Sequence, residues 1–125
     1  MKLRGKLQPG RGDSSKINRV LLDQFRELSG IPDLIAGTIN IHLDRKYVLP
    51  DTVSRLLAAE WPGKHDVLFQ RCRVLGRDSV IIRTEPNNAR GELVPQEVLE
   101  IASNIGFRTE FNLSDGDEIE VEIYD

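Results

Sequence analysis

The chain has 125 residues, of which 39% are hydrophobic and 30% are charged, and its formal net charge at pH 7 is −3. We expect one domain over residues 1–125, because this length supports one hydrophobic core and is too short for two. The single cysteine, Cys72, excludes an internal disulfide. The first residues lack an apolar signal core, and no apolar run reaches transmembrane length, so we expect a protein of the reducing cytoplasm.

Charge is distributed unevenly along the chain. Residues 1–30 contain seven Lys or Arg and three Asp or Glu, a balance of +4, whereas residues 110–125 contain seven Asp or Glu and no Lys or Arg, a balance of −7. A basic first part suits a ligand that carries phosphate. The negative overall charge argues against nucleic acid as a partner.

Residues 2–8 are predicted to form a short strand, and residues 8–16 form a loop rich in glycine and small polar side chains. Such a loop leaves backbone N–H groups free and permits positive φ, which are the two requirements of a phosphate cradle. The loop lacks both the P-loop and the dinucleotide-binding fingerprint. A plain surface turn is the alternative.

A helix is predicted from Ile17 to Leu28, because Ser14 or Ser15 can cap its start and Gly30 ends it. The next strand is predicted at residues 37–44, where apolar and polar residues alternate.

Two polar residues on that strand, Thr38 and Asn40, share one face because side chains alternate along a strand. Their neutral oxygens can face one hard cation or a phosphate, and Gly37 would let the ligand approach the backbone. An ordinary solvated strand face is the alternative.

The middle of the chain predicts a helix over residues 52–60, followed by strands at 67–75 and 80–84 joined by a hairpin connection at 76–79. Cys72 lies in the first of these strands, and we interpret it as a packing residue rather than a nucleophile. His42 and His65 have no cysteine or carboxylate pattern around them, so we expect no zinc site.

Residues 85–91 predict a polar loop that is either a bare connection or a ligand contact. Pro95 is predicted to open a short helix that runs to Ser103. The last strand is predicted at residues 118–123, where three glutamates alternate with apolar residues; we interpret them as a sheet edge kept soluble by charge. Together these elements predict a mainly β protein, a small barrel with two or three short helices.

One segment resembles a known signature. Gly37 to Arg45 reads Gly-Thr-Ile-Asn-Ile-His-Leu-Asp-Arg, which resembles the Gly-Thr-x-Asn-x-x-Leu-Asp-Arg signature of the CTP-dependent riboflavin kinases, known mainly from archaea. Further matches at the family's spacing are Gly10, Gly12, Glu97–Ile101, Arg108, Phe111–Leu113 and Asp115–Asp117. The resemblance is weaker over residues 46–96.

The resemblance implies a cradle-loop β-barrel with Greek-key strand order. It also implies transfer of the terminal phosphoryl group of CTP to the 5′-hydroxyl of riboflavin, which gives FMN and CDP. The partners would be riboflavin/FMN and CTP/CDP, with no nucleic acid and no membrane, and we expect a monomer.

Site residues carry over from the family by position. Thr38 and Asn40 would hold Mg²⁺, and the flavin would contact Glu100, together with Thr84 if an insertion follows Thr84 in this chain. The residues that would bind the nucleotide are Gly10, Arg11, Gly12, Asp13, Ser14, Ser15, Ile105, Gly106, Phe107 and Arg108. The resemblance identifies no general base, for which Asp13 and Asp44 are the candidates.

The first loop departs from the family pattern, which usually runs Gly-x-Gly-Glu-Gly-Arg-Tyr/Phe. Here serines replace a glycine and the arginine, and Lys16 follows one step later. Lysine supplies charge but not the bidentate fork of arginine, so the donor nucleotide stays open. A non-catalytic flavin- or nucleotide-binding barrel that keeps the family scaffold is the alternative function.

Overall fold

A computed structural model describes residues 1–10, 19–61 and 64–124 of the chain. The described residues form seven strands and three α-helices. The strands are β1 (Lys2–Gln8), β2 (Ile39–Leu43), β3 (Ser54–Leu56), β4 (Val67–Val74), β5 (Arg77–Thr84), β6 (Val98–Ser103) and β7 (Glu118–Ile123), and the helices are α1 (Arg19–Ser29), α2 (Glu85–Arg90) and α3 (Phe107–Glu110). The mainly β prediction is confirmed.

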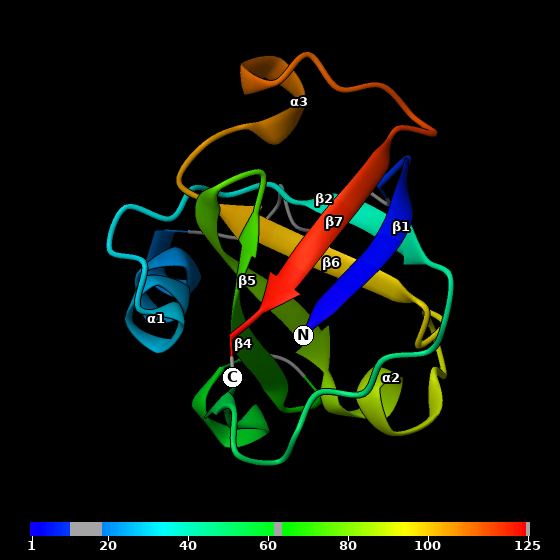
Figure 1. Cartoon of the computed structure of the whole chain (residues 1–125). Helices are drawn as coiled ribbons and strands as arrows, with labels where there is room; N and C mark the ends of the chain where they lie inside the picture. The colour runs from blue at the N-terminus through cyan, green and yellow to red at the C-terminus, as the bar shows by residue number, and fades with distance from the viewer. Residues whose placement is uncertain (11–18, 62–63, 125) are drawn as a thin grey trace.

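Six strands close into an antiparallel barrel, as predicted, and the helices lie outside it (Figure 1). The strands are ordered β4-β5-β6-β2-β1-β7, and β7 pairs with β4 through Val121–Ile123 and Cys72–Val74, which completes the circle. Strands β4, β5 and β6 follow one another in the chain and are neighbours in the sheet. Strand β2 precedes β4 in the chain and is joined to β4 by a long connection, but in the sheet it lies beside β6. This arrangement is a Greek key, as expected from the resemblance.

The interpretation of β7 as a sheet edge is wrong, because β7 is paired on both sides. Its glutamates instead face the basic side chains of β1. The cross-strand pairs are Lys2–Glu122, Arg4–Glu120 and Lys6–Glu118. The basic beginning and the acidic end of the sequence are therefore neighbours in the barrel, and their alternating charges favour this pairing.

Two hydrophobic clusters hold the structure together. The barrel interior is filled by the inward side chains of the six strands, among them Leu3, Ile41, Cys72, Leu99 and Val121. A second cluster lies outside the barrel. It joins α1 and the segment after it to residues of β3, β4, β5 and β6, and the rings of Phe25 and Phe69 meet edge to face at 4.9 Å. Part of the outer face of these strands is therefore covered as well.

The helix predicted from Pro95 to Ser103 is wrong, because this segment contains strand β6. All residues of β6 are buried except Glu100, which is half-buried. One face of the strand lines the barrel and the other lies partly under the second cluster, so the alternation of polar and apolar residues that signals a strand is largely lost.

Three smaller expectations are also corrected. The segment 52–60 forms the short strand β3 and a 3₁₀ helix, Ala58–Glu60, rather than one helix, and the loop predicted at 85–91 contains α2. The β4–β5 hairpin turns over two residues, Leu75 and Gly76, whose φ angles of 52° and 77° fit a type I′ turn. The helix predicted at 17–28 corresponds to α1; residues 17 and 18 lie outside the described residues.

A buried arginine joins the segments at the α2 end of the barrel. The Arg83 guanidinium donates hydrogen bonds to the carbonyls of Tyr47, Gln96 and Val98 and to the side-chain oxygen of Asn88. Burial lowers the pKa of Arg83 to about 10, which keeps the side chain protonated at neutral pH. Asn88 in turn bonds both backbone groups of Leu49.

We predict that Arg83→Leu lowers the free energy of unfolding by about 3 kcal/mol or more, because several buried acceptors lose their donor. Urea denaturation measures the change. Arg90→Leu, which removes an exposed arginine of α2, is the control and should cost less than about 0.5 kcal/mol. Equal losses in the two variants would contradict a bracing role for Arg83.

Candidate functional site

The pairing of β2 with β6 places three of the predicted site residues together. Asn40 lies directly opposite Glu100 in the register of the two strands. The Thr38 hydroxyl donates a hydrogen bond to Oε1 of Glu100 at 3.1 Å. Directly opposed side chains lie about 5 Å apart at Cβ, so Thr38, Asn40 and Glu100 form one polar group.

This polar group lies on the outer face of the barrel, because the neighbouring Ile39 and Ile41 point inward. The row of cross-strand neighbours runs from Gln8 through Asn40 and Glu100 to Ile82. Gln8 is the last residue of β1, so the start of the glycine-rich first loop adjoins the same row.

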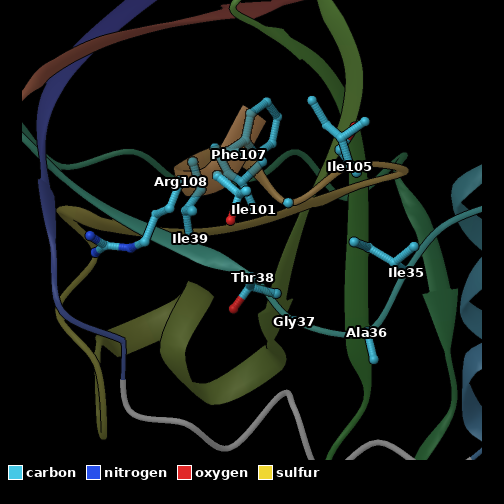
Figure 2. Close-up of a pocket in the computed structure, with 12 residues that line it drawn as sticks. Ile35, Ala36, Gly37, Thr38, Ile39, Ile101, Ile105, Phe107 and Arg108 are labelled. Carbon is cyan, nitrogen blue, oxygen red and sulfur yellow. The ribbon is translucent and has the colours of Figure 1, made fainter. Parts of the chain in front are cut away.

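A pocket of about 170 Å³ opens beside Thr38 (Figure 2). Its lining comes from the segment before and into β2, from β6, and from the segment that leads into α3; the lining residues are Ile35, Ala36, Gly37, Thr38, Ile39, Ile101, Ser103, Ile105, Gly106, Phe107, Arg108 and Thr109. The predicted nucleotide-binding segment Ile105–Arg108 therefore lies next to the predicted metal-binding residue Thr38.

The pocket is apolar over most of its wall, to which Ile35, Ile105 and Phe107 contribute, and its lining also includes the polar residues Thr38 and Arg108 (Figure 2). Small-molecule sites commonly combine an apolar wall with a few polar groups, but they are larger, about 300–1,000 Å³. At about 170 Å³, this pocket is smaller than such sites.

Arg108 extends from α3 toward β1 (Figure 2). Its guanidinium donates to the carbonyl of Gln8 at 3.1 Å and to Oδ1 of Asp115 at 2.6 Å. The charge of Arg108 is therefore partly neutralised by Asp115, and a phosphate there would compete with this carboxylate. The contact with Gln8 ties α3 to the end of β1, where the first loop begins.

Gly37 has a φ of 101°, a conformation that L side chains rarely adopt. A Cβ at this position would meet no described atom within 4 Å, so the backbone conformation rather than crowding requires glycine. This turn directs the chain from the pocket wall at Ala36 into β2.

The remaining predicted residues are placed less closely or lie outside the described residues. Gly10 is exposed just beyond β1, whereas Arg11, Gly12, Asp13, Ser14 and Ser15 are outside the described residues. Thr84 lies two residues beyond Ile82 on the same face of β5, roughly 7 Å along the strand. Asp44 lies past the other end of β2, roughly 13 Å from Asn40, and is not brought to the group.

The oxygen atoms of Thr38, Asn40 and Glu100 are ligands of the kind that Mg²⁺ takes. A hydroxyl, a carboxamide and a carboxylate supply oxygen ligands, and Mg²⁺ usually takes few protein ligands and completes its shell with water and phosphate. Within residues 1–10, 19–61 and 64–124, no three His, Cys, Asp or Glu side chains cluster in a way that could hold a metal ion.

Sequence reasoning missed two kinds of residue. The apolar wall at Ile35 and Ala36 carried a weak signal, since both directly precede Gly37. The Thr38–Glu100 hydrogen bond had no local signal, because it joins residues that are 62 positions apart. Asp115 follows Arg108 by only seven residues, but no pattern in the sequence marked the two as a pair.

No known family model matches the sequence, and a search of curated proteins found no similar protein. None of the helices in the described part of the chain is long and apolar enough to cross a membrane.

Cys72 is not part of the site. Its side chain is fully buried in the barrel interior, and burial raises the pKa of its thiol to about 12. A thiol with this pKa is almost entirely protonated at neutral pH, and the protonated form is a poor nucleophile. The interpretation of Cys72 as a packing residue agrees with this burial.

We predict that Cys72 in the folded protein does not react with Ellman's reagent within an hour at pH 8, whereas the protein in guanidinium chloride releases one equivalent of thiolate. The absorbance of the released product measures both reactions. Rapid stoichiometric reaction of the folded protein would contradict the buried, protonated thiol.

Proposed function

We propose that this protein is a CTP-dependent riboflavin kinase of the reducing cytoplasm. In this reaction a bond forms between the 5′ oxygen of riboflavin and the terminal phosphorus of CTP, the bond to the β-phosphate breaks, and the hydroxyl proton is released. The products are FMN and CDP.

The observation that carries the proposal is the convergence of four separated segments. Thr38, Asn40 and Glu100 form one group, Thr38 also lines the pocket together with the Ile105–Arg108 segment, and Arg108 contacts the end of β1 at Gln8. These are the segments in which the sequence resembles the kinase family, although they are far apart in the chain. A barrel that serves only as a scaffold would not need the side chains of Thr38, Asn40 and Glu100 at this position.

In the proposed site, Thr38 and Asn40 would hold Mg²⁺, which neutralises phosphate charge and orients the donor when it is bound. Phosphoryl transfer needs mainly positioning and charge stabilisation from the protein. Arg108 at the pocket rim, together with Arg11 and Lys16 of the first loop, would offset further phosphate charge.

Glu100 would orient the acceptor. Because Glu100 lies opposite Asn40 and accepts a hydrogen bond from Thr38, an alcohol bound at Glu100 would lie next to the residues that hold the metal. Transfer requires the acceptor oxygen and the terminal phosphate to be neighbours. Of the two candidate bases, Asp44 is too far from this group for direct proton transfer, and Asp13 lies outside the described residues.

A non-catalytic flavin- or nucleotide-binding barrel is the second candidate. The hydrogen bond between Arg108 and Asp115 favours it, since this pair reduces the positive charge available to phosphate. The serines in the first loop, where the family has a glycine and an arginine, favour it as well.

The test is to incubate the purified protein with riboflavin, Mg²⁺ and each of the four nucleoside triphosphates, and to separate FMN by chromatography. A larger amount of FMN with CTP than with any other nucleoside triphosphate would support the kinase. Quenching of flavin fluorescence on binding, without FMN from any donor, would instead support the binding protein and remove the kinase.

We predict that Thr38→Val and Asn40→Leu each lower the rate at least 100-fold, which corresponds to about 3 kcal/mol of transition-state stabilisation. Initial rates of FMN formation measure the loss, and the double variant should be little worse than the worse single variant, because both residues act through one ion.

The control is His42→Leu, which changes the next outward side chain of β2 and should keep the rate. Multiplicative losses in the double variant, or full activity of Asn40→Leu, would mean that Thr38 and Asn40 do not share a metal.

We predict that Glu100→Gln raises the KM for riboflavin about tenfold or more and the KM for CTP less, because a hydrogen bond to a charged acceptor is lost. Steady-state kinetics with each substrate varied in turn measure both constants. Glu118→Gln, which removes an exposed glutamate from β7, should change neither. An unchanged riboflavin KM in Glu100→Gln would exclude a flavin contact.

A further inference from the structure

A second hollow, of about 320 Å³, lies beside the hairpin that joins β4 and β5. It is lined by the segment that follows α1, by the hairpin and by Asn104, and it shares no lining residue with the pocket at Thr38. Three arginines contribute to it: Arg71 and Arg73 from β4 and Arg77 from β5.

One of these three arginines, Arg71, is anchored by the end of α1. Its Nη1 donates to the carbonyls of Ser29 and Gly30 at the end of α1, at 3.3 and 3.4 Å. Its Nε is buried and has no hydrogen-bond partner among the described residues. The guanidinium of Arg71 is therefore held in place on one side and keeps an unused donor on another.

The carboxylates around the hollow approach the arginines only at ion-pair distances. Asp78 lies 3.7 Å from Arg71 and 3.8 Å from Arg73, and Glu110 lies 3.6 Å from Arg77. These distances exceed those of charge-assisted hydrogen bonds, which are about 2.7–2.9 Å. A ligand anion could therefore make shorter contacts than these carboxylates make.

The two acidic residues in the lining also have other partners. Asp78 accepts a hydrogen bond from the Tyr124 hydroxyl at 2.7 Å, which lowers the pKa of Asp78, and Asp33 accepts one from Asn104 at 3.1 Å. Within the lining, three guanidinium groups face two carboxylates, and Glu110, which lies outside the lining, pairs with the third arginine, Arg77.

We propose that the arginine hollow, formed by Arg71, Arg73 and Arg77, binds a small molecule that carries phosphate. Guanidinium groups match phosphate oxygens with paired hydrogen bonds. The volume suits a small metabolite, and the three arginines gather in one hollow rather than along a stripe. Together with the chain's negative net charge, this favours a small anion over a nucleic acid.

The Nε–H of Arg71 is buried and belongs to the same guanidinium whose outer nitrogens would contact the anion. An anion bound in the hollow would change the electrostatic environment of this N–H, so its nuclear magnetic resonance signal reports occupancy.

The experiment titrates ¹⁵N-labelled protein with inorganic pyrophosphate at constant ionic strength and follows the Nε–Hε signals of the arginines. We expect a saturable shift of the Arg71 signal. Arg73→Gln and Arg77→Gln should each weaken the affinity about tenfold, as expected for the loss of one hydrogen bond between charged groups. The backbone spectrum establishes that each variant is folded.

Two control variants distinguish binding in this hollow from binding elsewhere on the protein. Arg45→Gln removes an exposed arginine on another part of the barrel, and Arg108→Gln changes the pocket at Thr38; both should leave the Arg71 titration unchanged. A linear or absent shift, an equal weakening by Arg45→Gln, or loss of the response in Arg108→Gln would overturn the proposal. None of these results depends on whether FMN is formed.

Discussion

The barrel depends on the double pairing of β7. This strand joins β1 on one side and β4 on the other, so the sheet has no open end at this position. Its inward side chains, Ile119, Val121 and Ile123, complete the interior cluster. Without β7 the sheet would have two unpaired edges, and the side chains of five strands would face solvent on one side. The opposite charges of the β1 and β7 side chains favour the same pairing.

A closed barrel fixes the register of every pair of neighbouring strands, and the candidate site follows from one of these registers. Asn40 meets Glu100 because Ile39 and Ile101 both point into the interior. A slip of one residue would turn the polar side chains into the core, at a large cost in free energy. The hydrophobic interior therefore specifies the positions of the polar residues outside it. The pocket beside Thr38 depends on the same packing, because Ile39 and Ile101 also line it.

The sequence predicted five of the six barrel strands, all except β6. Strands β1, β2 and β7 alternate apolar and polar residues, and the outward pair Thr38 and Asn40 could be found from this alternation alone. Strand β6 could not, because it is covered on most of both faces and because Pro95 imitates a helix start. The partner of Thr38 was also unpredictable, because Glu100 is 62 residues away and meets Thr38 only when β2 pairs with β6. Asp115 is only seven residues from Arg108, but nothing in the sequence marked this pair.

The existence of two separate hydrophobic clusters gives the protein two levels of local stability. The interior cluster belongs to the closed barrel and opens only when strands separate. The outer cluster joins α1 to β4, β5 and β6 through contacts such as Phe25 with Phe69, and it can be lost while the ladder of strand hydrogen bonds survives. Amide hydrogens of α1 should therefore exchange with solvent through partial opening, at a lower free energy than those of the barrel.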